Sequence, residues 1–204
     1  MRKNSFIQGA LILTVAGIIV KFIGAFSRIY LSRLLGGEGI GLYQMAYPIY
    51  LLCLSVSSAG LPVAISIMVA ERNAVRDYYG GQKVFRISMA ALTLTGLFFS
   101  ALLFFGAQWL VDSGIVRDQR AYWSLLALSP AVFCATLLAT LRGYFQGLQL
   151  MTPTAVSQII EQVVRVVTMI AFAVILLPYG LEFGAAGATL GAAPGAFTGI
   201  VVLI

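Results

Sequence analysis

The stretch GIGLYQMAYPIYLLCLSVSSAGLPVAISIMVA, residues 39–70, holds 32 consecutive residues without a charge. The hydrocarbon core of a bilayer is about 30 Å thick, and a helix needs about 20 mostly apolar residues to cross it. Residues 39–70 are therefore long enough for a membrane-spanning helix. Three further uncharged runs are also long enough to cross: 87–111, 121–141 and 183–204.

Two more apolar stretches, 5–35 and 154–177, carry charges inside them and complete the set. Spans this long and this uniformly apolar exclude a closed β-barrel, whose strands alternate in segments of about ten residues. We therefore predict an all-α polytopic membrane protein in which residues 1–204 form one bundle of six transmembrane helices. The predicted spans lie at about 5–35, 40–70, 87–111, 121–146, 154–177 and 183–204.

The composition excludes the soluble classes of protein. Charged residues make up 10% of the chain, against about 25% in an average soluble domain, and the mean hydropathy is +0.97. The chain has no His, which excludes a His-containing catalytic triad or a His-ligated metal. Cys53 and Cys134 lie inside apolar runs, so we expect no disulfide framework, metal or cofactor. The net charge of +6 is scattered between the spans, which favours a role in membrane topology over nucleic-acid binding.

The positions of Lys and Arg predict the orientation. Cytoplasmic loops of membrane proteins are enriched in these residues. With the amino terminus in the cytoplasm, seven cations lie in inside segments and three in outside loops. The segment 71–86 is then the largest cytoplasmic feature, predicted as a solvated basic loop near anionic lipid. The seven inside cations are Arg2, Lys3, Arg72, Arg76, Lys83, Arg86 and Arg142.

The first and last residues of the sequence bear on how much of a protein it represents. The start, MRKNSF, resembles a signal peptide, but the apolar run continues past Lys21 to Leu35 without an A-x-A cleavage pattern. The end, GAFTGIVVLI, reaches residue 204 with no cap, charge or polar tail. We therefore expect the chain to be the amino-terminal part of a larger protein.

The first span places two cations, Lys21 and Arg28, on a stripe of small and polar residues. A cation at the centre of a bilayer costs about 2.5–3.5 kcal/mol on insertion scales, so such residues normally face a protein interior or a wet cavity. Lys21 lies near the middle of the span and is predicted to face a cavity. For Arg28, reaching the outer headgroups by snorkelling is an equal alternative.

The fifth predicted span carries a second polar stripe with Glu161 and Arg165. Their i,i+4 spacing, with Glu nearer the amino end, is the favourable order for a helical ion pair. One interpretation is a neutralised pair that allows the helix to insert. The other places the pair beside a polar cavity, where Arg165 meets an anion and Glu161 holds it in reserve, and both can hold together.

Several residues predict hinges and packing. Gly36 and Gly37 are expected to end the first helix in an outer turn, and Pro48 and Pro62 to kink the second span. An aromatic belt is the ordinary explanation for three tyrosines near the outer end of that span, Tyr43, Tyr47 and Tyr50. A small-residue packing face is predicted on the last span by Gly184, Gly187 and Gly191.

Three segments carry a family resemblance: KFIGAFSRIYLSRLLGGEGIGLYQMAYPIY (21–50), LPVAISIMVAE (61–71) and RGYFQGLQLMTPTAVSQIIEQVVRV (142–166). The chain resembles the polysaccharide biosynthesis and export family, of stage V sporulation protein B-like proteins. That family lies in the multidrug/oligosaccharidyl-lipid/polysaccharide exporter superfamily, alongside the MurJ-type lipid II flippases. The third segment is the most specific, because R-G-Y-F-Q-G is followed in order by T-P-T-A-x-S-Q-x-x-E-Q.

The resemblance implies a longer bacterial cell-membrane protein with two helix bundles that exposes its site alternately to the two sides. It implies a flippase for a lipid-linked saccharide or peptidoglycan precursor, with membrane lipids and a coupling ion as candidate partners. In the related flippases, cations of the first helix contribute to a cavity for the pyrophosphate of the substrate. Lys21 matches a basic position of that pattern, whereas Arg28 is displaced by one residue, with Ser27 at the matching place.

Alternative functions are a drug or cation antiporter of the same superfamily, a non-transporting scaffold and a membrane-embedded enzyme. Three in-span cations against one in-span carboxylate, Glu161, favour an anionic substrate over a cationic one. An enzyme is disfavoured, since Asp77, Asp112 and Asp118 lie in predicted loops without a partner motif. No catalytic residue is predicted.

Overall fold

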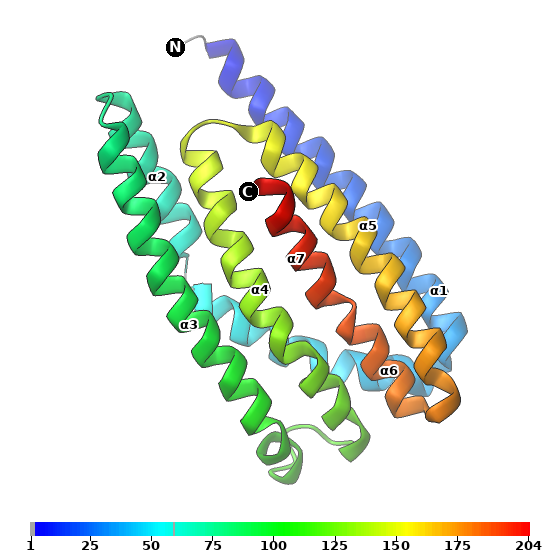
Figure 1. The fold of residues 1–204 in the computed structure, drawn as a ribbon. Helices are drawn as coiled ribbons and strands as arrows, with labels where there is room; N and C mark the ends of the chain where they lie inside the picture. Colours follow the sequence, from blue (N-terminus) through cyan, green and yellow to red (C-terminus); the bar gives the residue numbers. More distant parts are fainter. Residues whose placement is uncertain (1–2, 59) are drawn as a thin grey trace.

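The computed structural model describes residues 3–58 and 60–204, and the regular structure of these residues is entirely helical (Figure 1). The all-α fold class is therefore confirmed. Two short 3-10 helices, η1 (Gln119–Ala121) and η2 (Leu177–Tyr179), accompany seven α-helices. The α-helices are α1 (Lys3–Ser58), α2 (Leu61–Ala74), α3 (Tyr78–Asp112), α4 (Tyr122–Gly147), α5 (Met151–Leu176), α6 (Leu181–Leu190) and α7 (Ala192–Leu203).

Within residues 3–58 and 60–204, five helical segments are long and apolar enough to cross a membrane, rather than the six that we predicted. The first of them, Ile7–Ala74, covers nearly all of both expected spans, 5–35 and 40–70, because the helical segments before and after Gly36 follow each other without a loop between them. The other four are Tyr78–Asp112, Gln119–Gly147, Met151–Tyr179 and Leu181–Leu203. The chain is thus a multi-pass membrane protein.

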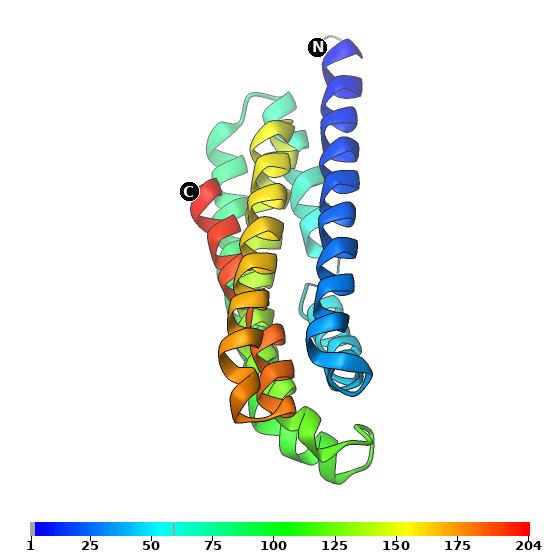
Figure 2. The same ribbon diagram turned by 90° about the vertical axis from the view of Figure 1, so that its right-hand side faces the viewer.

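A sharp bend divides α1 at Gly36, whose φ of 69° and ψ of −177° lie outside the helical region. A positive φ is readily adopted by glycine because it has no Cβ. Gly37 is helical in the same element. In Figure 2 the first segment of α1 descends to this bend, and in Figure 1 the second segment crosses the lower part of the bundle toward α3.

The second expected span is broken rather than kinked at Pro62. Gly60 adopts a left-handed φ of 74°, and α2 begins at Leu61 with Pro62 in its first turn. Proline is well tolerated there, since the first N–H groups of a helix have no intrahelical acceptor. Pro48, in contrast, lies inside the second segment of α1.

The expected basic loop 71–86 is also replaced by helix. Helix α2 continues to Ala74 and α3 begins at Tyr78, which leaves a turn of three residues, 75–77. Asp77 caps α3 by accepting a hydrogen bond from the Gly80 N–H at 2.8 Å, and it pairs with Arg72 at 3.1 Å. This capping explains why the helix starts well before its apolar stretch.

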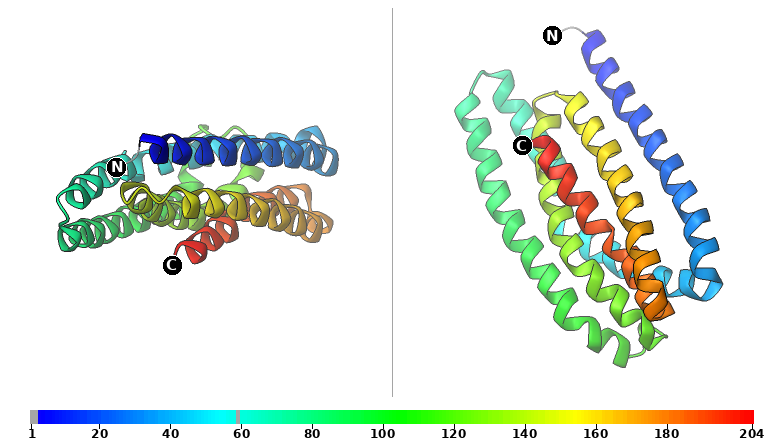
Figure 3. Two further views of the ribbon diagram at one scale, coloured as in Figure 1. Left: turned by 90° about the horizontal axis from the view of Figure 1, so that it is seen from above. Right: turned by 45° about the vertical axis from the view of Figure 1, so that its right-hand side comes forward.

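Helix α4 packs against α2, α3, α6 and α7, while α5 packs against α1, α6 and α7. The view from above shows α1 and α7 on opposite sides of α5 (Figure 3). The α2–α3 turn and the α4–α5 loop lie at the same end of the bundle as the start of α1, and the Gly36 bend lies at the other end (Figures 1 and 2). Which end faces the cytoplasm stays a prediction.

An ion-pair cluster ties the Gly36 bend to the loop that follows α3. Arg120 pairs with Glu38 at 2.7 Å and with Asp118 at 3.0 Å. The side-chain hydrogen bond from Arg120 holds the pKa of the Asp118 carboxyl below its usual range. Because Arg120 and Glu38 are exposed and Asp118 is only half-buried, the cluster fixes the geometry of this end more than it stabilises the fold.

Glycines set the closest helix contacts. A Cβ built at Gly143 of α4 would lie 2.6 Å from the carbonyl oxygen of Pro62 in α2. On the other side of the bundle, Gly187 and Gly191 lie against the backbone of α5, where a Cβ would come within 2.5 Å of Phe172 O and of Met169 N. Such spacings require small residues, as in other membrane helix pairs.

We predict that Gly143→Ala lowers the stability of the protein by about 1–3 kcal/mol, because the added methyl group meets backbone that must move. Gly106→Ala in α3 is the matched control, since its Cβ would meet nothing within 4 Å. The control is expected to be neutral or slightly stabilising. Thermal unfolding of both purified variants measures the difference, and equal melting temperatures would contradict the close α2–α4 contact.

Candidate functional site

Three cavities follow one another along the inner side of α1. The bend cavity, of about 730 Å³, lies beside the Gly36 bend and is lined by Arg28, Ser32, Tyr43, Tyr47 and neighbours. The central cavity has about 580 Å³ and the inner cavity about 430 Å³. Tyr47 lines all three cavities, so the three are neighbours, and each wall combines polar and apolar side chains.

The central cavity brings together the three cations that the sequence singled out. Lys21 and Arg28 come from the first segment of α1, and Arg165 comes from α5. No carboxylate of the described residues lies within ion-pair distance of Lys21 or Arg28. Both are exposed, and the positive charge on this cavity wall is therefore available to a ligand.

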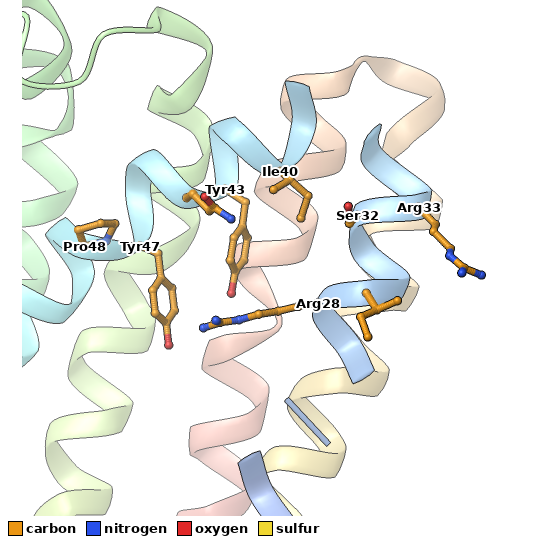
Figure 4. Close-up of a pocket in the computed structure, with 9 residues that line it drawn as sticks. Arg28, Ser32, Arg33, Ile40, Tyr43, Tyr47 and Pro48 are labelled. Atoms are coloured by element: carbon orange, nitrogen blue, oxygen red, sulfur yellow. The ribbon is translucent and has the colours of Figure 1, made fainter. Parts of the chain in front are cut away.

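All three tyrosines that we expected in an aromatic belt line the cavities, with Tyr50 at the inner cavity. Tyr43 and Tyr47 stack with ring centroids 5.7 Å apart, and both line the bend and central cavities. Figure 4 shows the Arg28 side chain extending toward these two rings, while Arg33 points away from them. Their i,i+4 spacing was the signal available in the sequence, since it places both rings on one helix face.

The predicted ion pair between Glu161 and Arg165 is present, with Arg165 Nη2 2.6 Å from Glu161 Oε1. The other carboxylate oxygen, Oε2, accepts a hydrogen bond from Arg142 Nη2 at 2.7 Å. Glu161 therefore bridges two arginines. The three side chains are mostly buried, with exposed fractions of 13% for Glu161, 18% for Arg142 and 22% for Arg165.

Arg142 was missed as a site residue, because we counted it among the cytoplasmic cations. The structure places it inside α4 and turned toward α5, where its Nε also donates to Ser157 Oγ at 3.1 Å. The following Gly143 and Gly147 pack against α2. The two glycines of the R-G-Y-F-Q-G segment thus fix one face of α4, and Arg142 takes another face.

Arg165 stands between the central and inner cavities and lines both. Its Nε is buried and has no hydrogen-bond partner among the described residues. A buried donor without an acceptor is costly, and a guanidinium has five N–H groups to satisfy. Arg165 therefore keeps unused hydrogen-bonding capacity beside the cavity.

The inner cavity is lined by both bridged arginines, Glu161, Gln146 and Pro62. Summed over the central and inner cavities, Lys21, Arg28, Arg142 and Arg165 give four positive charges against the one negative charge of Glu161. Among the described residues, no group of three Cys, Asp or Glu side chains gathers that could hold a metal ion. The electrostatics of the site therefore fit a polyanion.

The predicted hinge residues are distributed around this region. Pro48 lines the bend cavity and Pro62 the inner cavity, while Gly36 forms the bend of α1 itself. Gly37 lies next to the bend in helical backbone. Whether these positions move stays a prediction.

Comparison with known proteins gives a family match over nearly the whole chain. Residues 6–204 match the family model described as "Polysaccharide biosynthesis protein". Stage V sporulation protein B of Bacillus subtilis is 41% identical over 100% of this chain, and lipid II flippase MurJ of the same organism is 30% identical over 98%. The uncharacterised membrane protein YabM of B. subtilis is 29% identical over 100%.

The chain spans about two fifths of the length of these relatives, with 39%, 39% and 37% of each covered. No solved structure gives a significant match.

We predict that Glu161→Ala is the most harmful single change in the bridge, because it leaves two buried cations without a counter-charge. A cost of about 3 kcal/mol is expected from such a change. Arg165→Ala leaves Glu161 paired with Arg142 and is expected to cost about 1.5 kcal/mol. Denaturation of the single variants and of the double variant measures the coupling. A double variant that equals the sum of the singles would show that the two groups do not interact.

Proposed function

Because the chain belongs to the polysaccharide biosynthesis protein family, we propose that it contributes one helix bundle to a flippase. The flippase moves a lipid-linked saccharide or peptidoglycan precursor across the cytoplasmic membrane. A relative carries the name lipid II flippase, which supports a substrate of this class.

The observation that carries the proposal is the convergence of Lys21, Arg28 and Arg165 on the central cavity. A pyrophosphate that leaves water for a membrane interior must exchange its hydration shell for other donors. Charge-assisted hydrogen bonds from several cations are the strongest substitutes that a protein offers. The first segment of α1 supplies Lys21 and Arg28, and α5 supplies Arg165. A bound pyrophosphate would therefore connect these two helices.

In the proposed mechanism the lipid tail stays in the bilayer while the charged head group passes through the cavities. Alternating access requires one part of the protein to move against another around the bound head group. The breaks at Gly36 and Gly60 divide the chain before α3 into three helical segments. These breaks are the positions where backbone rotation costs least, and Pro48 and Pro62 lie close to the cavities that such rotation would open.

Two alternatives within the membrane proteins are less well supported. An antiporter for drugs or cations needs a free carboxylate in its cavity, whereas Glu161 is held by two arginines. A non-transporting scaffold gives no reason to place three cations around a hollow in the bundle. Enzymatic chemistry is not part of the proposal, because the cavities offer no pair of carboxylates for acid–base work.

For orientation we propose a cytoplasmic amino terminus, on the bias of six Lys and Arg residues against three that remains when Arg142 is counted inside α4 instead of in a loop. The turn between α2 and α3 then also faces the cytoplasm, since it lies at the same end of the bundle as the start of α1 (Figure 1). A coupling ion remains part of the proposal without an assigned site.

We predict that Lys21→Ala and Arg165→Ala each impair flipping of the precursor in the full-length protein by about tenfold or more, a loss that corresponds to one strong charge-assisted contact. Lys21→Arg should keep more activity than Lys21→Ala, because the charge matters more than the shape for a flexible phosphate contact. Arg28→Ala should be milder, since its side chain also reaches toward the tyrosines of the bend cavity.

The measurement is precursor flipping per folded protein, normalised to its abundance in the membrane. Lys83→Ala, which removes an exposed lysine near the start of α3, is the matched control and should keep normal flipping. Normal flipping by Lys21→Ala at normal abundance would contradict the proposed role of the central cavity.

A further inference from the structure

We propose that Glu161 is an internal counter-ion that occupies Arg165 until the pyrophosphate of the substrate replaces it as the partner of Arg165, and that Arg142 is the positioning residue that holds and neutralises Glu161 when Arg165 turns away. This inference rests on the proposed function. It gives the cavity a means of selecting pyrophosphate over anions of lower charge.

The first step of the argument is the division of the carboxylate between two partners. Glu161 Oε1 accepts a hydrogen bond from Arg165 Nη2 at 2.6 Å, and Glu161 Oε2 accepts one from Arg142 Nη2 at 2.7 Å. Each arginine thus holds one oxygen, and neither pair is the bidentate form that carboxylate and guanidinium favour. The Arg165 contact can therefore open while Glu161 remains neutralised by Arg142.

Arg142 is the fixed side of the bridge. Its Nε donates to Ser157 Oγ at 3.1 Å, and the Ser157 hydroxyl, fully buried, donates in turn to Thr154 O at 2.8 Å. The next residue, Gly143, is locked against the backbone of Pro62. Of the central and inner cavities, Arg142 lines the inner one, on the far side of Arg165 from Lys21.

Arg165 is the side that can change partner. It lines the central cavity together with Lys21 and Arg28, and its buried Nε has no acceptor among the described residues. The base of its side chain is held, since a Cβ at Gly195 of α7 would lie 2.8 Å from Arg165 Cβ. Exchange of partner thus needs rotation of the guanidinium alone, without a shift of α5 against α7.

The charges of the bridge favour a polyanionic ligand. At rest, two arginines and one glutamate leave an excess of one positive charge. When Arg165 turns to a phosphate, Glu161 and Arg142 remain as a neutral pair, so no charge is abandoned in the bundle. A ligand group with only one negative charge gains from Arg165 about what the glutamate already supplied. A pyrophosphate carries more negative charge than the Glu161 carboxylate at a similar distance from Arg165, so it replaces Glu161 as the partner of Arg165.

Two substitutions should therefore change ligand affinity in opposite directions. Glu161→Gln removes the competing charge and is expected to tighten pyrophosphate binding about tenfold, within the usual range of coupling between sites. Arg142→Gln leaves Glu161 to Arg165 alone and is expected to weaken pyrophosphate binding by a similar factor. A purely structural role of the bridge predicts weaker binding in both variants.

The experiment uses the purified full-length protein in lipid nanodiscs, with farnesyl pyrophosphate and farnesyl monophosphate as probes. The wild-type protein should prefer the pyrophosphate, and Glu161→Gln should bind both probes more tightly with a smaller preference. Arg142→Gln is the variant expected to fold well, because a neutral Glu161–Arg165 pair remains. If Glu161→Gln does not yield folded protein, the double variant Glu161→Gln/Arg142→Gln decides, because it removes the competing charge and leaves Arg165 as the one cation of the bridge. Tighter binding by the double variant than by Arg142→Gln supports the exchange, and equal or weaker binding overturns it.

Lys21→Ala in the same assay separates this inference from the proposed function on which it rests. If Lys21→Ala binds farnesyl pyrophosphate as the wild type does, the cation cavity itself is wrong. If Lys21→Ala weakens binding while Glu161→Gln binds no tighter, or while Arg142→Gln binds like the wild type, the cavity stands and the counter-ion exchange is overturned.

Discussion

A buried charge needs a partner, and the bridge Arg142–Glu161–Arg165 meets this constraint between α4 and α5. Without Glu161 the two arginines would repel each other in a bundle that has few other carboxylates to offer. The glycines of α7 depend on the same arrangement, because Gly195 lies against the backbone and Cβ of the paired residues of α5. The bridge thus fixes the place of α4, α5 and α7 relative to one another, and it holds Arg165 at the edge of the central cavity.

Beside this bridge, Lys21 and Arg28 have no counter-charge within ion-pair distance among the described residues. Lys21 and Arg28 come from the first segment of α1, which the Gly36 bend separates from the segment that carries the tyrosines. The cavity wall is therefore assembled from separate pieces of chain, the two segments of α1 and helix α5. Such a cavity is suited to a negatively charged ligand. It is also suited to a change of shape when the ligand binds.

Much of this architecture could be predicted from where the charges lie in the sequence. The uncharged runs gave the spans, and the polar stripes of Lys21 and of Glu161–Arg165 gave three cavity cations and one ion pair. The rest depends on tertiary contacts. Arg142 looks like a loop cation until α4 is seen to continue past it, and Pro62 looks like a kink until Gly60 is seen to break the helix. Tyr43 and Tyr47 fit an aromatic belt equally well until the bend of α1 turns them toward Arg28.

The most direct test of the account is the structure of the full-length protein in lipid with a prenyl pyrophosphate bound. The account predicts phosphate oxygens within hydrogen-bond distance of Lys21 and Arg165, with the Arg165 guanidinium withdrawn from Glu161 and the Arg142–Glu161 pair intact. A pyrophosphate bound away from the central cavity would contradict the account. So would a ligand in that cavity that leaves Lys21 without a phosphate contact.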